Sequence, residues 1–288
     1  MTTIEHAGTG KAVSATSGRD RTAHRLAGQT DSTMPLARPP ELDITVVVPY
    51  YNPGGERLVP TVERLMTVLD RTGADYEVLA VNDGSTDGSA QDLEVAIARW
   101  DSTPTSKGRV RSITYTPNRG KGAALRTGIA QARGHYIGFI DADGDLDPGL
   151  MGHFLEVARA TGVDMVVGSK AHEASVVDNP LIRRTYSWGY HKLVKALLKV
   201  AVKDTQTGAK LARRELMAAV VPDMLEDGFA FDVELLAMAH RLGYTKVLEE
   251  PIVLKRRPGD LSTVSMKAVW RTAVSTLAIF ARLRLAHR

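Results

Sequence analysis

The feature that most constrains this chain is the alternation of apolar, strand-like runs with helix-like segments. Runs rich in β-branched residues are separated by stretches in which apolar residues recur at helical spacing. The expected strands span 44–49, 76–81, 110–115, 136–140, 165–168 and 245–248, and the expected helices span 56–72, 89–99 and 123–133. This alternation predicts an α/β fold with a mostly parallel sheet. Because ligands bind at the carboxyl ends of the strands in such sheets, the residues after each strand are the first candidates for a site.

The two ends of the chain differ in composition from this alternating region. Residues 1–40 are rich in Gly, Ser, Thr and Ala and lack an apolar signal-peptide core, so we expect a disordered leader. Residues 41–254 are expected to form the folded domain. Residues 255–288 contain eight Lys or Arg and one Asp, although the whole chain has a net charge of only +4. This basic end predicts an anionic partner, either lipid phosphate or nucleic acid.

The sequence lacks two features, cysteine and a long apolar segment, and each absence excludes a class of protein or site. The chain contains no Cys, which excludes disulfides, thiolate metal sites and cysteine nucleophiles. A bilayer span needs roughly 20 apolar residues, whereas the stretch between Arg271 and Arg282 has only ten residues and contains Thr and Ser. We therefore expect that the protein does not cross a membrane by itself.

Four carboxylates lie directly after the expected strand 136–140, at Asp141, Asp143, Asp145 and Asp147. Carboxylates this close together repel one another unless a cation or solvent offsets their charge. Mg²⁺ and Mn²⁺ prefer such oxygen ligands and share them with substrate phosphates. The cluster therefore predicts either a divalent metal site or a solvated acidic turn.

A glycine-containing loop, NRGKG at 118–122, precedes the expected helix 123–133. Small residues let backbone N–H groups approach an anion at a helix N-terminus. The third glycine of a dinucleotide fingerprint is replaced by Leu125, and the loop follows the third strand rather than the first. We therefore expect a phosphate or nucleotide contact here rather than a dehydrogenase site, with a plain glycine-rich helix start as the alternative.

Asp83 follows the expected strand 76–81 and could accept hydrogen bonds from a nucleobase or a ribose. The segment PYYN at 49–52, where the first strand ends, would form an aromatic wall beside it. The alternative for Asp83 is a turn residue or a helix cap.

The order of these motifs resembles that of the GT-A family-2 glycosyltransferases. The motifs are VVVPYYN at 46–52, VNDGSTDG at 81–88, NRGKG at 118–122 and DAD at 141–143. Three later segments, VGSKAH at 167–172, DTQTGAK at 204–210 and FAFDVELL at 229–236, are similar to the polyprenyl- and dolichyl-phosphate sugar synthases, in particular the dolichyl-phosphate β-glucosyltransferase group. The resemblance implies a GT-A (Rossmann-like) fold with amphipathic helices at the C-terminus, and a nucleotide-diphosphate sugar as donor.

The resemblance also implies roles for individual residues. The residues that bind the nucleotide sugar would be Pro49, Tyr51, Asp83, Lys121, Asp141 and Lys210. Asp141 and Asp143 would hold Mg²⁺ or Mn²⁺, which would stabilise charge on the leaving nucleotide. Asp141, Asp143 and Asp232 form the expected catalytic set.

The acceptor side is expected to bind a lipid monophosphate. Arg183 matches the acceptor-phosphate position of similar synthases, and Lys170 is its expected companion, although many relatives have Arg at the position of Lys170. Two fixed cations would bind such a phosphate strongly. The alternative for Arg183 is a surface residue at a helix N-terminus.

Two basic helices are expected near the acceptor. The lysines at 192, 195, 199 and 203 share one face of an expected helix at 191–203. In the C-terminal helix, Lys267, Arg271 and Arg282 lie along one side, and the apolar stripe is formed by Met266, Trp270, Val274 and Leu277. Such helices predict binding to an anionic membrane surface, or else core helices with a solvated basic face.

Together these features predict an inverting glycosyltransferase that moves a hexose from UDP-glucose, or from GDP-mannose, to polyprenyl phosphate. It would act in the cytoplasm, at the inner face of the membrane, with no nucleic-acid partner and with a membrane-protein partner or a homo-oligomer left open. A phosphate acceptor needs no strong base, so Asp232 is assigned to positioning or sugar contact. The alternatives are a glycan hydroxyl as acceptor, with Asp232 as the base, and a catalytically silent protein that binds membranes or nucleic acid.

Overall fold

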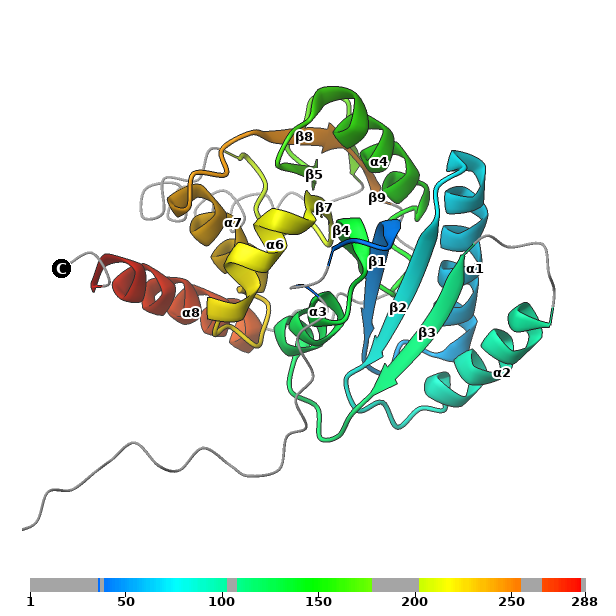
Figure 1. Cartoon of the computed structure of the whole chain (residues 1–288). Helices are drawn as coiled ribbons and strands as arrows, with labels where there is room; N and C mark the ends of the chain where they lie inside the picture. The colour runs from blue at the N-terminus through cyan, green and yellow to red at the C-terminus, as the bar shows by residue number, and fades with distance from the viewer. Residues whose placement is uncertain (1–35, 37–38, 103–107, 178–201, 255–265, 286–288) are drawn as a thin grey trace, which may run out of the picture. The chain divides into compact units, whose positions relative to one another are not determined.

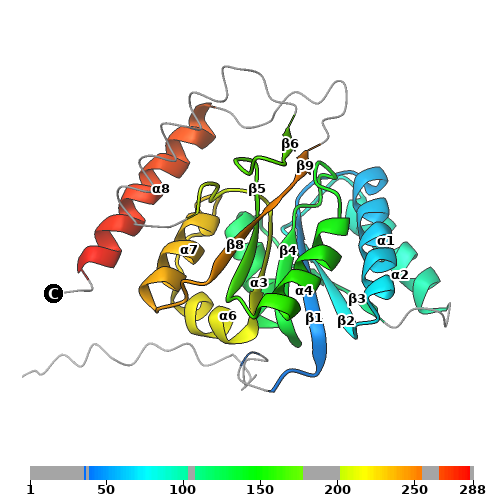
Figure 2. The same cartoon turned by 90° about the horizontal axis from the view of Figure 1, so that it is seen from above.

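The computed structural model describes residues 36, 39–102, 108–177, 202–254 and 266–285. The expected leader lies outside these residues apart from Leu36 and the two prolines at 39 and 40, and the expected helix 191–203 lies outside them apart from 202 and 203. Figures 1 and 2 show the described elements in two views.

A seven-stranded sheet in the described part of the chain forms the centre of the fold, with strand order β3-β2-β1-β4-β7-β5-β8. The strands are β1 (Leu42–Tyr50), β2 (Tyr76–Asn82), β3 (Arg109–Thr114), β4 (Gly134–Ile140), β5 (Met165–Ser169), β7 (Ala209–Arg213) and β8 (Val247–Pro251). Strands β1 to β4 pair in parallel, as does β5 with β8, whereas β7 runs antiparallel to β4 and β5. The predicted mostly parallel α/β sheet is therefore confirmed.

Helices cover both faces of this sheet (Figure 1). One apolar core contains residues of α1 (Gly55–Thr72), α2 (Ser89–Asp101) and α4 (Gly149–Thr161). The other core contains residues of α3 (Lys121–Ala130), α6 (Arg214–Val220) and α7 (Phe231–Arg241). Successive residues of β1 alternate between the cores, with Val46 and Val48 in the first and Val47 in the second. Burial on both faces explains why this strand is a continuous apolar run rather than an alternating one.

The C-terminal helix α8 (Met266–Leu285) packs beside α7 in both views (Figures 1 and 2). Ile279 is buried in the second core, and Phe280 and Leu283 pack against that core. Trp270, Val274 and Leu277 are exposed, so the helix has one packed face and one apolar face open to solvent. None of the helices in the described ranges has the length and apolar character that a membrane span requires.

Several short elements differ from the sequence-based expectation. Strand β7 was not expected, because its centre carries Lys210, and a charged residue disfavours a buried strand. The sequence pattern set no bounds for the helices α4, α6 and α7, and it missed the 3₁₀ turn Val221–Asp223 and the pair of short strands β6 (Val176–Val177) and β9 (Val253–Leu254). Helix α3 begins at Lys121 rather than at 123, which places the lysine of the glycine-containing loop at the first helical position.

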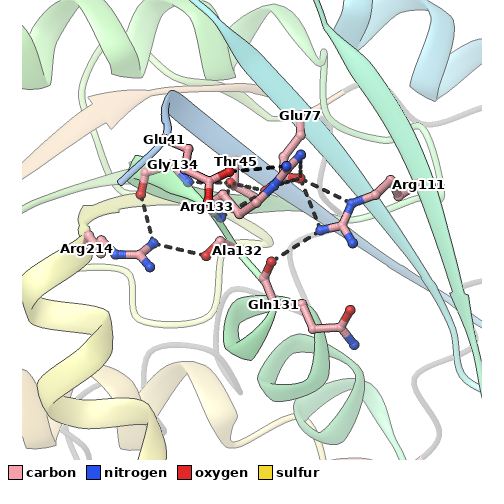
Figure 3. Close-up of polar contacts among 9 residues, drawn as sticks. All are labelled: Glu41, Thr45, Glu77, Arg111, Gln131, Ala132, Arg133, Gly134 and Arg214. Atoms are coloured by element: carbon pink, nitrogen blue, oxygen red, sulfur yellow. Dashed lines mark hydrogen bonds and ion pairs between the residues drawn. The ribbon is translucent and has the colours of Figure 1, made fainter. Parts of the chain in front are cut away.

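A charged cluster joins the strands at their amino ends (Figure 3). The Glu77 side chain in β2 is fully buried. It accepts hydrogen bonds from the Thr45 hydroxyl at 2.8 Å, the Arg133 backbone N–H at 2.9 Å, and the guanidinium groups of Arg133 and Arg111 at 2.9 and 3.1 Å. Arg214 is also buried nearby and donates to the carbonyls of Ala132 and Gly134. A buried carboxylate with this many donors ties β1, β2, β3 and the start of β4 together.

Candidate functional site

A pocket of about 1110 Å³ opens at the carboxyl ends of β1, β2 and β4. Its walls come from the loops after these strands, the start of α3, the loop 226–229 and the N-terminal half of α8. The polar and aromatic lining includes Tyr51, Asn52, Arg57, Asp83, Arg119, Lys121, Asp141, Asp143, Glu226, Asp227, Phe229 and Arg271. Motifs that lie up to about 90 residues apart in the sequence, from Pro49 to Asp143, therefore meet at one edge of the sheet.

Asp83 holds the glycine-containing loop in place. Its carboxylate accepts hydrogen bonds from the Arg119 N–H at 2.7 Å, the Gly120 N–H at 2.8 Å and the Asn118 amide at 2.9 Å. Asp83 is only 3% exposed, although it lines the pocket. In the structure Asp83 therefore holds the loop 118–120, a role that neither the ligand contact nor the turn expected from the sequence included.

The glycines of this loop are required by a protein contact. Gly120 has a φ of 105°, which favours glycine, and a Cβ there would collide with the Asp227 carbonyl. A Cβ at Gly122 would collide with the Glu226 carbonyl. The Gly122 N–H donates to the Asp227 carbonyl at 2.8 Å. The expected anion cradle is therefore corrected at Gly120 and Gly122, because their N–H groups are already bonded to protein oxygens.

The loop after β1 is fixed by the loop after β2. The Asn52 amide oxygen accepts from the Thr86 N–H at 2.7 Å, and the Asp87 carboxylate accepts from the Gly54 N–H at 2.8 Å. Asn52 has a φ of 48°, a left-handed conformation that Asn tolerates. This turn leaves Tyr51 52% exposed at the pocket, where its ring is available to a ligand.

Asp141 and Asp143 share the pocket with Lys121. The Lys121 ammonium lies 2.6 Å from Asp141 Oδ1. Burial alone would lower the pKa of Lys121, but the charges of Asp141 and Asp232 outweigh burial and hold this pKa above its usual value. Desolvation in the pocket, followed by the charge of Asp141, raises the pKa of Asp143 to about 6, although the side chain still reaches solvent. The pair therefore carries negative charge that the protein only partly neutralises.

Asp232 and Lys210 lie beneath this pair. Lys210 is fully buried, and its ammonium lies 2.5 Å from Asp232 Oδ1 and 2.7 Å from the Thr207 carbonyl. Burial lowers the pKa of Lys210, and Asp232 opposes that shift. The other carboxylate oxygen of Asp232, Oδ2, lies 4.0 Å from the Lys121 ammonium. Neither Asp232 nor Lys210 lines the pocket, so both lie one layer behind its surface.

The donor set at Asp141 and Asp143 fits a hard divalent cation. The described residues contain no group of three or more His, Cys, Asp or Glu that could hold a metal. Two carboxylates beside an open pocket nevertheless match Mg²⁺, which binds through one or two carboxylates together with waters and substrate phosphates. Desolvation and the neighbouring charge of Asp141 both raise the pKa of Asp143, and a bound cation would oppose both effects.

The expected acceptor residues are less fully described. Lys170 follows β5 and does not line the pocket. Its ammonium lies 3.6 Å from Asp204, and its backbone N–H donates to the same carboxylate at 2.9 Å. Asp204 is fully buried and also accepts from the Thr207 hydroxyl. Arg183 lies outside the described residues.

Sequence reasoning missed one set of residues that shapes the pocket. Glu234 of α7 is fully buried and accepts hydrogen bonds from the N–H groups of Leu225 and Glu226. Arg282 of α8 forms an ion pair with the same carboxylate. Glu234 therefore connects α8 to the loop 225–228, which in turn contacts Gly120 and Gly122. No short-range pattern indicates this connection, because it joins residues 48 positions apart.

A family model described as glycosyl transferase family 2 matches residues 45–220 of the chain. Dolichyl-phosphate beta-glucosyltransferase of Saccharomyces cerevisiae is 31% identical over 216 residues, which cover 70% of this chain and 64% of the yeast protein. The human protein of the same name is 34% identical over 223 residues, 74% of this chain and 67% of the human protein. The chain thus spans slightly less than two thirds of the yeast relative.

The fold is also similar to that of a solved glucosyl-3-phosphoglycerate synthase from Mycobacterium tuberculosis, crystallised with Mn²⁺, UDP-glucose and phosphoglyceric acid. The TM-score is 0.60 at 20% identity, covering 84% of this chain and 80% of that one. At this level of identity the likeness concerns the fold alone.

Proposed function

Because the chain belongs to glycosyl transferase family 2, we propose that it is a metal-dependent hexosyltransferase that moves a sugar from a nucleotide-diphosphate sugar to a polyprenyl phosphate. UDP-glucose is the favoured donor, GDP-mannose is the alternative, and the reaction inverts the configuration at the sugar C1. The observation that carries the proposal is the pocket that brings Tyr51, Asp83, Lys121, Asp141 and Asp143 together. The names of the curated relatives support the sugar and the lipid phosphate acceptor.

The donor would lie along the carboxyl edge of the sheet. The exposed ring of Tyr51, beside Pro49, would stack on the nucleobase. Asp83 would act through the loop 118–120, whose N–H groups it binds, and so would fix the position of Lys121. Lys210 would act on the donor site indirectly, since it is buried and pairs with Asp232.

Asp141 and Asp143 would hold the divalent metal, Mg²⁺ or Mn²⁺. When bound, such an ion neutralises the charge that develops on the leaving nucleoside diphosphate. Asp141 is confined for this role, because its backbone N–H donates to the Gly208 carbonyl and a Cβ at Gly208 would collide with its carboxylate. A fixed carboxylate loses little freedom when it binds an ion, which favours binding.

The acceptor would approach from the side of α8. Arg271 of this helix lines the pocket, and Trp270, Val274 and Leu277 expose apolar surface on the same helix. We propose that this surface contacts lipid, that residues 255–288 form a membrane-proximal segment after a catalytic domain at 41–254, and that the enzyme acts at the cytoplasmic face of the membrane. Lys170 and Arg183 remain the proposed acceptor-phosphate residues.

Flotation with phosphatidylserine vesicles tests the lipid contact, since Trp270→Glu should abolish flotation of the full chain.

The rival acceptor is a glycan hydroxyl, which would need Asp232 as a general base. A base must reach the proton that it removes. Asp232 is 2% exposed, does not line the pocket, and is held by Lys210 at 2.5 Å. These contacts favour a positioning role for Asp232 and therefore an acceptor that is already ionised.

A radiolabelled donor panel tests the proposal. UDP-glucose and GDP-mannose are each supplied with Mn²⁺ and one of three acceptors: polyprenyl phosphate, unphosphorylated polyprenol or 3-phosphoglycerate. Label in the lipid phase from UDP-glucose with polyprenyl phosphate, lost on addition of EDTA, is the expected result. Transfer to polyprenol would establish the hydroxyl alternative, transfer to 3-phosphoglycerate would replace the lipid acceptor, and no transfer in any arm would indicate a silent protein.

A further inference from the structure

Four charged side chains form a row that runs from the pocket into the core. Asp141 Oδ1 lies 2.6 Å from the Lys121 ammonium, which lies 4.0 Å from Asp232 Oδ2, and Asp232 Oδ1 lies 2.5 Å from the Lys210 ammonium. Negative and positive charges alternate along the row. Lys121 lies between the two carboxylates: it contacts Asp141 closely, and its distance to Asp232 Oδ2 is about 1 Å longer than a hydrogen bond.

The two carboxylates beside Lys121 differ in freedom and in access. Asp141 lines the pocket, and its side chain is 28% exposed. The side chain of Asp232 is only 3% exposed, and Lys210 fixes its Oδ1. Among the described residues, Lys121 is the cation that faces Asp232 Oδ2. Asp232 therefore presents one anchored oxygen and one oxygen directed at Lys121.

Asp141 is proposed above as a metal ligand, yet it is already occupied by an ammonium group. A divalent cation and the Lys121 ammonium would repel each other if both contacted this carboxylate. The lysine chain has several rotatable bonds, whereas Asp141 is confined against Gly208. Lys121 is thus the partner that can move, and Asp232 Oδ2 is the nearest carboxylate oxygen toward which it can move.

We propose that Lys121 is an internal counter-cation that exchanges partners. It neutralises Asp141 while that carboxylate lacks a metal, and it moves to Asp232 when Asp141 takes a divalent cation. Asp232 is then a positioning residue that receives the ammonium, and Lys210 holds Asp232 in place through its Oδ1. This inference rests on the proposed function, because it assumes that Asp141 binds the metal.

The exchange makes a definite statement about metal affinity. Lys121 and the metal compete for Asp141, so the Lys121→Met variant should bind Mn²⁺ more tightly than the wild type. Asp232→Asn removes the second position for the ammonium, so it should bind Mn²⁺ more weakly. In the Lys121→Met background no ammonium has to move, and Asp232→Asn should then have little effect.

The experiment measures Mn²⁺ binding to the full chain without donor, from the electron paramagnetic resonance signal of free Mn²⁺. We expect Lys121→Met to lower the Kd about 10-fold, Asp232→Asn to raise it about 10-fold, and the double variant to match Lys121→Met within about twofold. Arg119→Met is the matched control, because it removes a neighbouring pocket cation that packs on Tyr115. It should change the Kd by less than about threefold.

Folding is controlled by a second pair of variants. Asp232→Asn leaves Lys210 buried beside a neutral side chain, so the cycle is repeated with Lys210→Met/Asp232→Asn, and thermal unfolding is recorded for each protein. A Kd for Lys121→Met that is unchanged or higher overturns the exchange. The exchange is also overturned if Asp232→Asn raises the Kd by the same factor with and without Lys121, because that result would show only a long-range effect of the Asp232 charge. A wild-type protein that does not bind Mn²⁺ would overturn the metal assignment together with the exchange.

Discussion

The central sheet buries charge at the edge where its parallel strands begin, the amino edge, and at the edge where they end, the carboxyl edge. The two edges neutralise this charge differently. At the amino edge, the carboxylate of Glu77 is enclosed by two guanidinium groups, a hydroxyl and a backbone N–H (Figure 3). At the carboxyl edge, Asp141 shares its single lysine with Asp232, and the pKa of Asp143 is raised to about 6. The amino edge is a closed network, whereas the Asp141 and Asp143 pair at the carboxyl edge is only partly neutralised.

The difference shows which charges stabilise the fold and which prepare a site. Removing one partner of a fully hydrogen-bonded buried carboxylate strongly destabilises the fold, because it leaves an uncompensated buried charge. Carboxylates that face a pocket with too few neighbouring cations instead lower the free energy of unfolding, and the binding of a cation there raises it again. We therefore expect substitutions at the two edges to change different properties.

The largest effect is expected from Asp141→Asn at the carboxyl edge. Loss of a metal-binding carboxylate should lower sugar transfer at least about 1000-fold, since metal ions contribute several kcal/mol to such transition states. Stability should change much less than activity, because the Lys121 ammonium still faces Asp232 Oδ2. Transfer rates and thermal unfolding are measured together, with Asp147→Asn as the control, because this exposed carboxylate of the same loop does not line the pocket. Equal losses in the two variants would contradict the assignment of Asp141.

A smaller effect, on stability rather than on activity, is expected from Glu77→Gln at the amino edge. The substitution leaves Arg111 and Arg133 without their buried counter-charge, and unfolding in urea should show a loss of about 3–5 kcal/mol. The rate constant kcat of the folded fraction should be unchanged. Glu63→Gln is the control, because its ion pair with Arg99 is 41–65% exposed and should contribute less than about 1 kcal/mol. A selective loss of kcat in Glu77→Gln would erase the distinction between the edges.

The smallest effect is expected from Asp143→Asn, and its sign is opposite. The raised pKa of Asp143 means that its ionised form destabilises the folded state, fully so above about pH 6. In EDTA at pH 7.5 the variant should therefore be more stable than the wild type, by no more than about 1 kcal/mol because the side chain reaches solvent. The gain should disappear as the pH falls from 6 toward the ordinary pKa of 3.8. Calorimetry across this range would contradict the prediction by showing a gain that does not depend on pH.

The sequence predicted the carboxyl edge well because its signal is local. The polar motifs at Asp83, Lys121 and Asp141 each follow a strand or open a helix, and parallel strands bring these positions together. The amino edge had no such signal. Glu77, Arg111 and Arg133 are single charges near strand ends, and from sequence alone each resembles an ordinary surface residue.

By itself, the sequence determined the alternation of strands and helices from β1 to β4, the edge of the sheet at which the candidate site residues gather, and the family to which the chain belongs. Only the tertiary structure decided the partner of each charge: Lys210 with Asp232, Lys121 between Asp141 and Asp232, and Glu234 with Arg282. It also decided that Gly120 and Gly122 accommodate the loop 226–228 rather than an anion. The physical reason is that periodicity and turn chemistry act between near neighbours, whereas a buried charge is stabilised only by a partner that the completed fold brings to it from a distant part of the chain.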